Sequence, residues 1–272
     1  MDLSLVKKAA TLLVQSRYAV ALTGAGISTE SGIPDFRSPG GIWERYDPSV
    51  FYYQRFLAEP AFVWKTIIKM GNDTGFSLFK AEPNKGHKAL AALEEMGILK
   101  SVITQNIDNL HQKAGSKRVI EFHGNMLYVK CIKCSRKYSY TEVLERIDMD
   151  NLPPRCECGG VLKPDAVFFG EAIPQMAMTE AFSEANMCDL MLVVGTSAQV
   201  EPAASLPSMA KGQRSILSGM SDLFFPKEKA HVIEINREST SLTDTVSDFL
   251  IKGAAGEVLS SIVDKVMQIK GI

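Results

Sequence analysis

Two glycines separated by a single residue, Gly24 and Gly26, stand between a short apolar run and a segment rich in hydroxyl and charged side chains. An apolar strand that passes through a Gly-x-Gly turn into a helix brings backbone N–H groups to the positive end of that helix, which is a site for a pyrophosphate. A tight turn between a strand and a helix would explain the same pattern. The stretch 19–37 is therefore a candidate nucleotide cradle.

This stretch departs from the dinucleotide-binding fingerprint at two points. The pattern Gly-x-Gly-x-x-Gly requires a glycine where this chain has Thr29. The acidic residue that should hold a ribose, about 20 positions farther on, would be Glu44 or Asp47, and neither follows a strand pattern. The sequence therefore predicts a cradle that differs from that of an ordinary dehydrogenase.

Four of the five cysteines fall in two close pairs, Cys131 with Cys134 and Cys156 with Cys158. Two such pairs, about 20 residues apart, can supply four thiolates to one tetrahedral zinc. Free cysteines in loops are the alternative, but charged residues and glycines surround both pairs. Because four ligands leave no open position, we predict one structural zinc per chain, with an altered knuckle at the short Cys-x-Cys pair. Cys188 is expected to be a small buried apolar residue.

Polar side chains follow three of the predicted strands, in the segments 104–108, 122–125 and 195–197. Ligands of open α/β sheets bind beyond the carboxyl ends of the strands, so we expect these groups to converge on the crevice that the stretch 19–37 lines. An isolated Asn-x-Asp, as in 106–108, is also typical of a helix cap. Three polar strand ends beside one glycine-rich loop favour a ligand site.

His123 is one of four histidines, and it follows an apolar strand and precedes Gly124. A neutral imidazole at that edge could take a proton from a sugar hydroxyl. His87, His111 and His231 lie within predicted helices or strands, where a structural role is the alternative. His123 is therefore the candidate general base.

Composition limits the protein class. The 272 residues are 46% apolar and 22% charged, which is typical of a globular protein with a large core. A net charge of −1 gives no basic field, so we expect no direct nucleic-acid binding. The first residues lack a secretory pattern, and no apolar run approaches the roughly 18 residues of a membrane span. We therefore expect a cytoplasmic protein that does not associate with a membrane.

The elements that must position these residues alternate along the chain. Apolar runs predict strands at 19–23, 101–104, 119–122, 190–194 and 232–235, and helical periodicity predicts helices at 2–16, 87–96, 107–114, 174–185, 202–210 and 254–269. Continuous apolar strands alternating with helices predict an α/β fold with a parallel sheet covered on both faces. Irregular segments with aromatic residues (38–75) and with the paired cysteines (127–167) interrupt this pattern.

Taken together, the motifs resemble the signatures of the sirtuins, the NAD-dependent protein deacylases, in the same order and over nearly the whole chain. They are the segments 24–28, 31–37, 104–108, 123–124, 167–171, 195–197 and 235–236, with the two cysteine pairs. The resemblance implies a Rossmann-like NAD-binding domain formed by residues 1–37, 84–126 and 166–272. A small domain would consist of a cofactor loop and helical insertion (38–83) and a zinc-binding module (127–165).

The resemblance also implies roles for individual residues. Contacts to NAD are expected from Gly24, Ala25, Gly26, Thr29, Asp35, Phe36, Arg37, Gln105, Asn106, Ile107, Asp108, Gly195, Thr196, Ser197, Asn236 and Ala255. Among them, Phe36, Ile107 and Asp108 would form the nicotinamide pocket. Catalysis would fall to His123 and Asn106. The acylated peptide would lie against Val167, Phe169, Gly170, Glu171 and Val200, adding as a strand between two loops.

The implied reaction consumes the cofactor. The acetyl oxygen of an acetyl-lysine protein or peptide attacks the anomeric carbon of the ribose as nicotinamide leaves, and His123 acts as general base on a ribose hydroxyl. The products are lysine, nicotinamide and O-acetyl-ADP-ribose. Two alternatives stay open: a protein mono-ADP-ribosyltransferase that uses the same cleft, and a catalytically idle module that senses NAD. The sequence leaves the oligomeric state open.

Two further segments carry expectations. Sirtuins that prefer acidic acyl groups have a Tyr and an Arg three residues apart in the helical insertion, and this chain has Ile67 and Met70 there. Apolar side chains cannot pair a carboxylate, so acetyl or longer apolar acyl groups are expected over succinyl. The segment 213–229 is longer than expected for the family; it is either a surface loop packed on its own domain or a partner contact.

Overall fold

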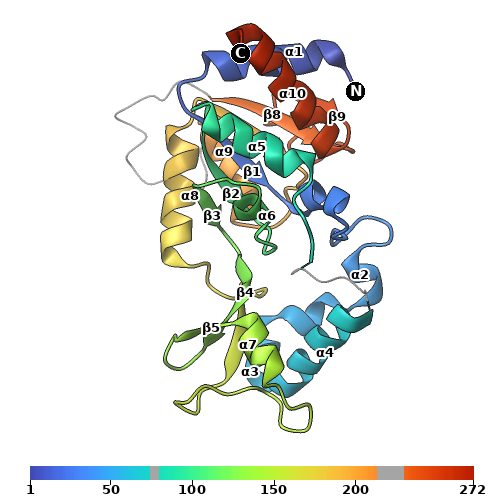
Figure 1. The fold of residues 1–272 in the computed structure, drawn as a ribbon, viewed down its shortest axis with the longest axis vertical. Helices are drawn as coiled ribbons and strands as arrows, with labels where there is room; N and C mark the ends of the chain where they lie inside the picture. Colours follow the sequence, from blue (N-terminus) through green and yellow to red (C-terminus); the bar gives the residue numbers. More distant parts are fainter. Residues whose placement is uncertain (74–79, 213–229) are drawn as a thin grey trace.

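A computed structural model describes residues 1–73, 80–212 and 230–272 (Figure 1). The expectation about the segment 213–229 therefore lies outside the described residues. Figure 1 shows an upper part that holds both chain termini, and a lower part that several segments of the chain connect to it. We call the part around the six-stranded sheet the large lobe, and the part around a three-stranded sheet and the helices α2, α3, α4 and α7 the small lobe.

The large lobe contains a parallel sheet with the strand order β3-β2-β1-β7-β8-β9. Its strands are β1 (Ala19–Thr23), β2 (Leu99–Thr104), β3 (Val119–Glu121), β7 (Leu190–Val194), β8 (His231–Asn236) and β9 (Phe249–Lys252). Successive strands of the chain are added beside β1 on one side (β2, then β3) and beside β7 on the other side (β8, then β9). The strand order thus reverses between β1 and β7, which is the place where open α/β sheets bind ligands.

Alternate residues of β1 point into two separate hydrophobic clusters, as the pleat of a strand requires. Ala19 and Ala21 join a cluster with α1 (Leu3–Gln15), α5 (Lys85–Glu95) and α10 (Ala255–Lys270). Val20 and Leu22 join a cluster with α8 (Gln175–Met187) and α9 (Leu206–Ala210) on the opposite face. The sheet is therefore covered on both faces, and its polar groups are left at the strand ends.

Short helical turns complete the large lobe. They are η1 (Ala25–Ser31), α6 (Leu110–Lys113) and η3 (Ala203–Ser205). The sequence predicted a helix over 107–114, but it begins only at Leu110, because Asn109 takes a left-handed conformation with φ 63°. The strand β9 was not predicted; it has four residues and lies at the edge of the sheet.

The small lobe has one antiparallel sheet and several short helices. Its elements are α2 (Ile42–Arg45), η2 (Pro48–Phe51), α3 (Tyr53–Ala58), α4 (Pro60–Asp73), β4 (Gly124–Cys131), β5 (Lys137–Ser139), α7 (Tyr140–Glu145) and β6 (Leu162–Ala166). The strand order is β5-β4-β6. Trp64 is fully buried at the centre of its hydrophobic cluster, where its indole N–H donates to the carbonyl of Leu162 at 2.7 Å. None of the helices within the described residues is both long and apolar enough to cross a membrane.

Candidate active site

The carboxyl ends of β1 and β7 lie in contact, and glycines make this possible. The N–H of Gly26 donates to the carbonyl of Gly195 at 2.8 Å. A side chain at Gly26 would place its Cβ 2.8 Å from Gly195, and one at Gly195 would place its Cβ 2.4 Å from the backbone nitrogen of Ile27. Gly195 also has φ +60°, which side chains rarely adopt. The Gly-x-Gly pattern thus serves the contact between the two loops.

A buried polar network fills the space behind the first loop. The Ser28 hydroxyl donates to Asp108 Oδ2 at 2.7 Å, and the Asn106 amide donates to the Ser28 oxygen at 3.0 Å and to the carbonyl of Gly24 at 3.2 Å. The other Asp108 oxygen accepts from the backbone N–H of Leu110 at 2.9 Å. Burial raises the pKa of Asp108, while these donors favour its ionised form. The network fixes the Asn106 and Asp108 side chains before any ligand binds.

His87 supports this network from the start of α5. Its Nδ1 accepts from the backbone N–H of Asn84 at 3.4 Å, so in neutral imidazole the proton lies on Nε2. Nε2 then donates to the Ser28 oxygen at 3.3 Å. Burial lowers the pKa of His87 to about 4, which keeps the ring neutral near pH 7. Ser28 therefore has its proton directed to Asp108.

Residues from the ends of three strands of the sheet meet at Thr196. Its hydroxyl accepts from the side-chain amide of Gln105 at 2.9 Å, and its carbonyl accepts from the side-chain amide of Asn236 at 3.0 Å. Gln105 follows β2, Thr196 follows β7, and Asn236 ends β8. The predicted convergence of polar strand ends is thus observed for these residues, and Ser197 lies next to them, half-buried.

His123 lies in the two-residue connection between β3 and β4. Its Nδ1 is 3.2 Å from the carbonyl oxygen of Gln105, which can only accept, so Nδ1 carries the proton in the neutral ring. The Nε2 lone pair is then available to accept a proton. Burial lowers the pKa of His123, whereas the bond to Gln105 opposes this shift. Gly124 has φ +78° and would place a Cβ 2.0 Å from the carbonyl oxygen of Asp165, so a side chain there would displace β6.

The end of the first loop turns toward the small lobe. Asp35 Oδ1 accepts from the backbone N–H groups of Arg37 at 3.0 Å and Ser38 at 2.8 Å, which closes a turn. The Phe36 ring lies 5.0 Å from Trp43, and Trp43 lies 6.2 Å from Phe169. An aromatic chain therefore joins the predicted cofactor loop to the predicted substrate loop.

The predicted substrate residues occupy two loops. The backbone of Phe169 is already paired: its N–H donates to Phe51 and its carbonyl accepts from Tyr53, both at 2.9 Å. The N–H of Val167 donates to the carbonyl of His123 at 2.9 Å, which ties this loop to the candidate base. Val200 lies in the other loop, after β7.

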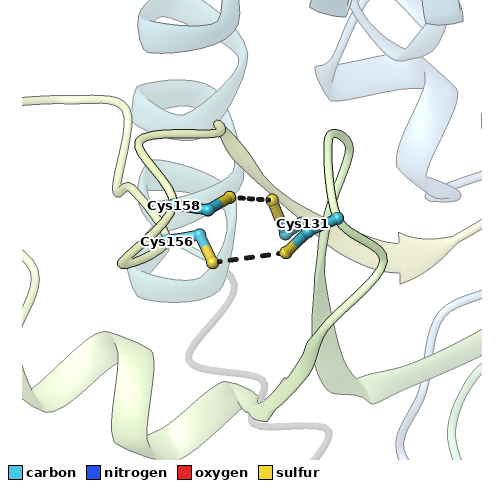
Figure 2. A group of neighbouring side chains, drawn as sticks. Cys131, Cys156 and Cys158 are labelled. Carbon is cyan, nitrogen blue, oxygen red and sulfur yellow. Dashed lines mark hydrogen bonds between the residues drawn. The ribbon is translucent and has the colours of Figure 1, made fainter.

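The four paired cysteines converge in the small lobe, as the sequence predicted (Figure 2). All four sulfurs lie within 4.8 Å of one another, and the Sγ atoms of Cys131 and Cys158, and of Cys134 and Cys156, are 3.6 Å apart. Zinc–sulfur bonds of about 2.3 Å in a tetrahedron place the sulfurs about 3.8 Å apart, so the cluster fits zinc.

Two glycines accommodate the short second cysteine pair. Gly159 has φ +78°, and a Cβ on Gly160 would lie 2.6 Å from the sulfur of Cys131. The backbone N–H of Cys156 donates to the carbonyl of Gly160 at 2.8 Å, which closes the loop that carries the pair. Cys188 is buried in the large lobe, as expected.

The remaining predicted cofactor residues lie around the same edge. The Thr29 hydroxyl donates to the carbonyl of Gly26 at 3.0 Å, and Arg37 is exposed. Ala25 and Ile107 are half-buried in their loops. Ala255 starts α10 with its side chain buried in the core of the large lobe, so only its backbone could face a ligand.

The sequence indicated no individual role for Ser28 or Asn84 and only a structural one for His87, yet these residues complete the network. Ser28 and His87 are 59 residues apart, and their contact depends on the packing of α5 against η1. The capping pattern Asn-x-x-His at the start of α5 was the available signal, because it orients the His87 ring.

Comparisons with known proteins agree with this geometry. A family model described as "Sir2 family" matches residues 24–202. The NAD-dependent protein deacylase 2 of Pyrobaculum aerophilum is 43% identical over 259 residues, with 94% of each chain covered. The NAD-dependent protein deacetylase of Thermodesulfovibrio yellowstonii is 44% identical over 268 residues, with 97% of each chain covered. A solved Sir2 variant with a deacetylated p53 peptide and 3′-O-acetyl-ADP-ribose is 36% identical, with a TM-score of 0.82 and coverage of 98% and 99%.

Proposed function

Because this chain belongs to the Sir2 family, we propose that it is an NAD-dependent protein-lysine deacetylase that forms nicotinamide, free lysine and O-acetyl-ADP-ribose. Relatives named as deacetylases or deacylases match nearly its whole length. A similar structure holds both a deacetylated peptide and an acetylated ADP-ribose. The reversal of strand order between β1 and β7, with glycine-rich loops at both strand ends, suits a dinucleotide.

The observation that carries this proposal is the contact of His123 Nδ1 with the carbonyl oxygen of Gln105, which sets the tautomer of the neutral ring. Its Nδ1 proton is committed to the carbonyl of Gln105, so the neutral ring presents an unprotonated Nε2. Because its pKa is lowered by burial, the ring is neutral at physiological pH. A general base for a sugar hydroxyl requires this state. Bound NAD would supply the ribosyl group that accepts the acetyl oxygen and the nicotinamide that departs.

The other residues position the substrates and exclude water. Asn106 and Asp108, held by Ser28, would orient the nicotinamide side, and Thr196 with Asn236 would hold the adenosine side. Ala25, Thr29 and Arg37, in and after the first loop, would hold the phosphates beside the start of η1. Most of the rate enhancement then comes from orientation in a water-poor cleft.

The small lobe would provide the peptide half of the site. Zinc held by the four cysteines would have a structural role, because the four sulfurs occupy all positions of a tetrahedron. An acylated peptide would add as a strand between the loop at 167–171 and the loop at Val200, with main-chain bonds supplying affinity. The backbone of Phe169 is paired with Phe51 and Tyr53, so other residues of its loop would make those bonds. The division into an NAD-binding domain (1–37, 84–126, 166–272) and a small domain belongs to this proposal. So does a cytoplasmic location, which suits metal-binding thiols.

The test follows acetyl-lysine peptide, NAD and products by mass spectrometry. We expect one nicotinamide and one O-acetyl-ADP-ribose per lysine released, and no reaction without NAD. Label from NAD retained on protein while the peptide stays acetylated would support the ADP-ribosyltransferase instead. Binding of NAD with no turnover of any acetylated peptide would support the idle module.

The acyl group is a second part of the proposal. Ile67 is 5% exposed within the aromatic cluster of the small lobe, and Met70 lies one turn farther along α4. Neither side chain can pair a carboxylate, so acetyl and longer apolar chains should react faster than succinyl chains. We expect kcat/KM for an acetyl-lysine peptide to exceed that for the matched succinyl-lysine peptide at least about tenfold. Faster turnover of the succinyl peptide would show that this assignment is wrong.

A further inference from the structure

Lys163 is an almost fully buried lysine in β6, five residues after Cys158. Its Nζ donates to the carbonyl oxygens of Pro164 at 2.8 Å and Ala166 at 2.6 Å. Lysine is almost never this buried unless its charge is paired. The interactions that pair the buried charge of Lys163 therefore indicate a specific role for this residue.

The partner of this charge lies in the predicted substrate loop. Lys163 Nζ is 3.0 Å from Glu171 Oε2 and 4.3 Å from the centre of the Phe168 ring. The same Glu171 oxygen accepts from the backbone N–H of Phe168 at 2.8 Å, and the N–H of Glu171 donates to the carbonyl of Phe168 at 3.0 Å. Between them, Gly170 has φ +75°. The ion pair thus closes the tight turn that carries the loop.

The Glu171 side chain turns back onto its own loop and onto β6. Its carboxylate points to Lys163 and to the backbone of Phe168. Within this turn, the backbone of Phe169 forms hydrogen bonds with Phe51 and Tyr53. Just before the turn, the N–H of Val167 donates to the carbonyl of His123. A shift of the turn would therefore move the peptide-binding backbone relative to the candidate base.

We propose that Lys163 is a positioning residue for the acylated peptide, holding the loop at 167–171 in its binding shape through Glu171. This inference rests on the proposed deacetylase function. Lys163 belongs to the strand that leaves the cysteine cluster, so it also links the zinc-bound part of the small lobe to the peptide site. It contacts none of the residues assigned to NAD.

Two variants separate positioning from general stability. Lys163→Met keeps the length of the side chain but removes its charge, and Lys163→Arg keeps the charge. Lys137→Met is a matched control, because Lys137 also pairs with an acidic residue of the small lobe, Asp165 at 2.5 Å, but its side chain is 56% exposed. Exposed ion pairs contribute little.

The experiment measures kcat and KM for an acetyl-lysine peptide at saturating NAD, and KM for NAD at saturating peptide. In Lys163→Met we expect the peptide KM to rise about tenfold, within the roughly 100-fold that a 1 Å misplacement can cost. The KM for NAD should stay within about twofold, because an interaction with one substrate affects that substrate's binding. Lys163→Arg should recover most of the loss, and Lys137→Met should resemble the native enzyme.

Zinc content and the thermal midpoint show whether each variant folds. If Lys163→Met does not fold, Glu171→Gln carries the test. This variant removes the negative charge that pairs with Lys163, and the Glu171 side chain is already partly exposed. Where Lys163→Met does fold, the double variant Lys163→Met with Glu171→Gln should be no worse than the poorer single variant. An unchanged peptide KM in a folded variant, or equal losses for peptide and NAD, would overturn the inference. A native enzyme that does not deacetylate at all would instead refute the proposed function.

Discussion

The two lobes hold their parts of the site by different means. In the large lobe, two aliphatic clusters cover the sheet, and the polar residues at the strand ends bond to one another. In the small lobe, one aromatic cluster packs around Trp64, and the four cysteines and the Lys163–Glu171 pair join its loops. The proposed cofactor half of the site is therefore built on the strand ends of the sheet, whereas the proposed peptide half would depend on zinc and on the buried Lys163–Glu171 ion pair.

Removal of zinc should have the largest effect, and it should damage the small lobe while leaving the large lobe folded. Structural zinc sites contribute on the order of 10 kcal/mol to folding, and the small lobe has a limited core of its own. Chelation, or Cys156→Ser, should abolish deacetylation and increase hydrogen exchange in β4, β5 and β6, while ADP-ribose still binds the large lobe. Calorimetry with ADP-ribose and hydrogen exchange would check this. Full activity of a zinc-free protein would contradict it.

Gly195→Ala should damage the large lobe in turn. A Cβ at this residue would lie 2.4 Å from the backbone nitrogen of Ile27, and φ +60° is itself unfavourable for alanine. We expect a loss of about 1–3 kcal/mol in the free energy of unfolding and weaker NAD binding. Gly212→Ala is the matched control, because Gly212 also has a positive φ (+69°), but no atom of the described residues lies within 4 Å of its added Cβ. Equal NAD affinity in both variants would show that the contact between the two loops does not shape the cofactor site.

Acid should destabilise the large lobe through its buried histidines. The pKa of His87 is lowered from 6.5 to about 4, so between these values the unfolded chain binds a proton that the folded chain does not. Stability contributed by neutral His87 is therefore present above pH 6.5 and falls by about 3 kcal/mol as the pH drops to 4. Urea unfolding of the native protein and of His87→Gln at several pH values would measure the difference. His231→Gln is the control, because the His231 side chain is 53% exposed. The same pH dependence in His87→Gln as in the native protein would contradict this.

Much of the large lobe could be predicted from the sequence, because its strands are continuous apolar runs. The predicted strands 19–23 and 190–194 have the observed bounds. The cysteine cluster was predictable because metal ligation requires a narrow spacing of one residue type. Zinc chemistry sets that requirement independently of the surrounding fold.

The remaining features arise only from tertiary packing. The strands β4–β6 carry a polar, irregular pattern, and their pairing follows from the close approach of Gly124 to Asp165. The Ser28–His87 contact joins residues far apart in the chain, and Lys163 reads in the sequence as an ordinary surface lysine. Such buried polar groups are defined by partners that local patterns do not encode.

The central claim is that His123, as a neutral base, supports an NAD-consuming deacetylation. The direct test is the rate of acetyl-lysine peptide deacetylation with and without NAD, in the native protein and in His123→Ala. We predict that the native reaction requires NAD and that His123→Ala lowers kcat about 100-fold or more, with its fold and ADP-ribose binding retained. Deacetylation without NAD, or an undiminished rate in His123→Ala, would contradict the mechanism.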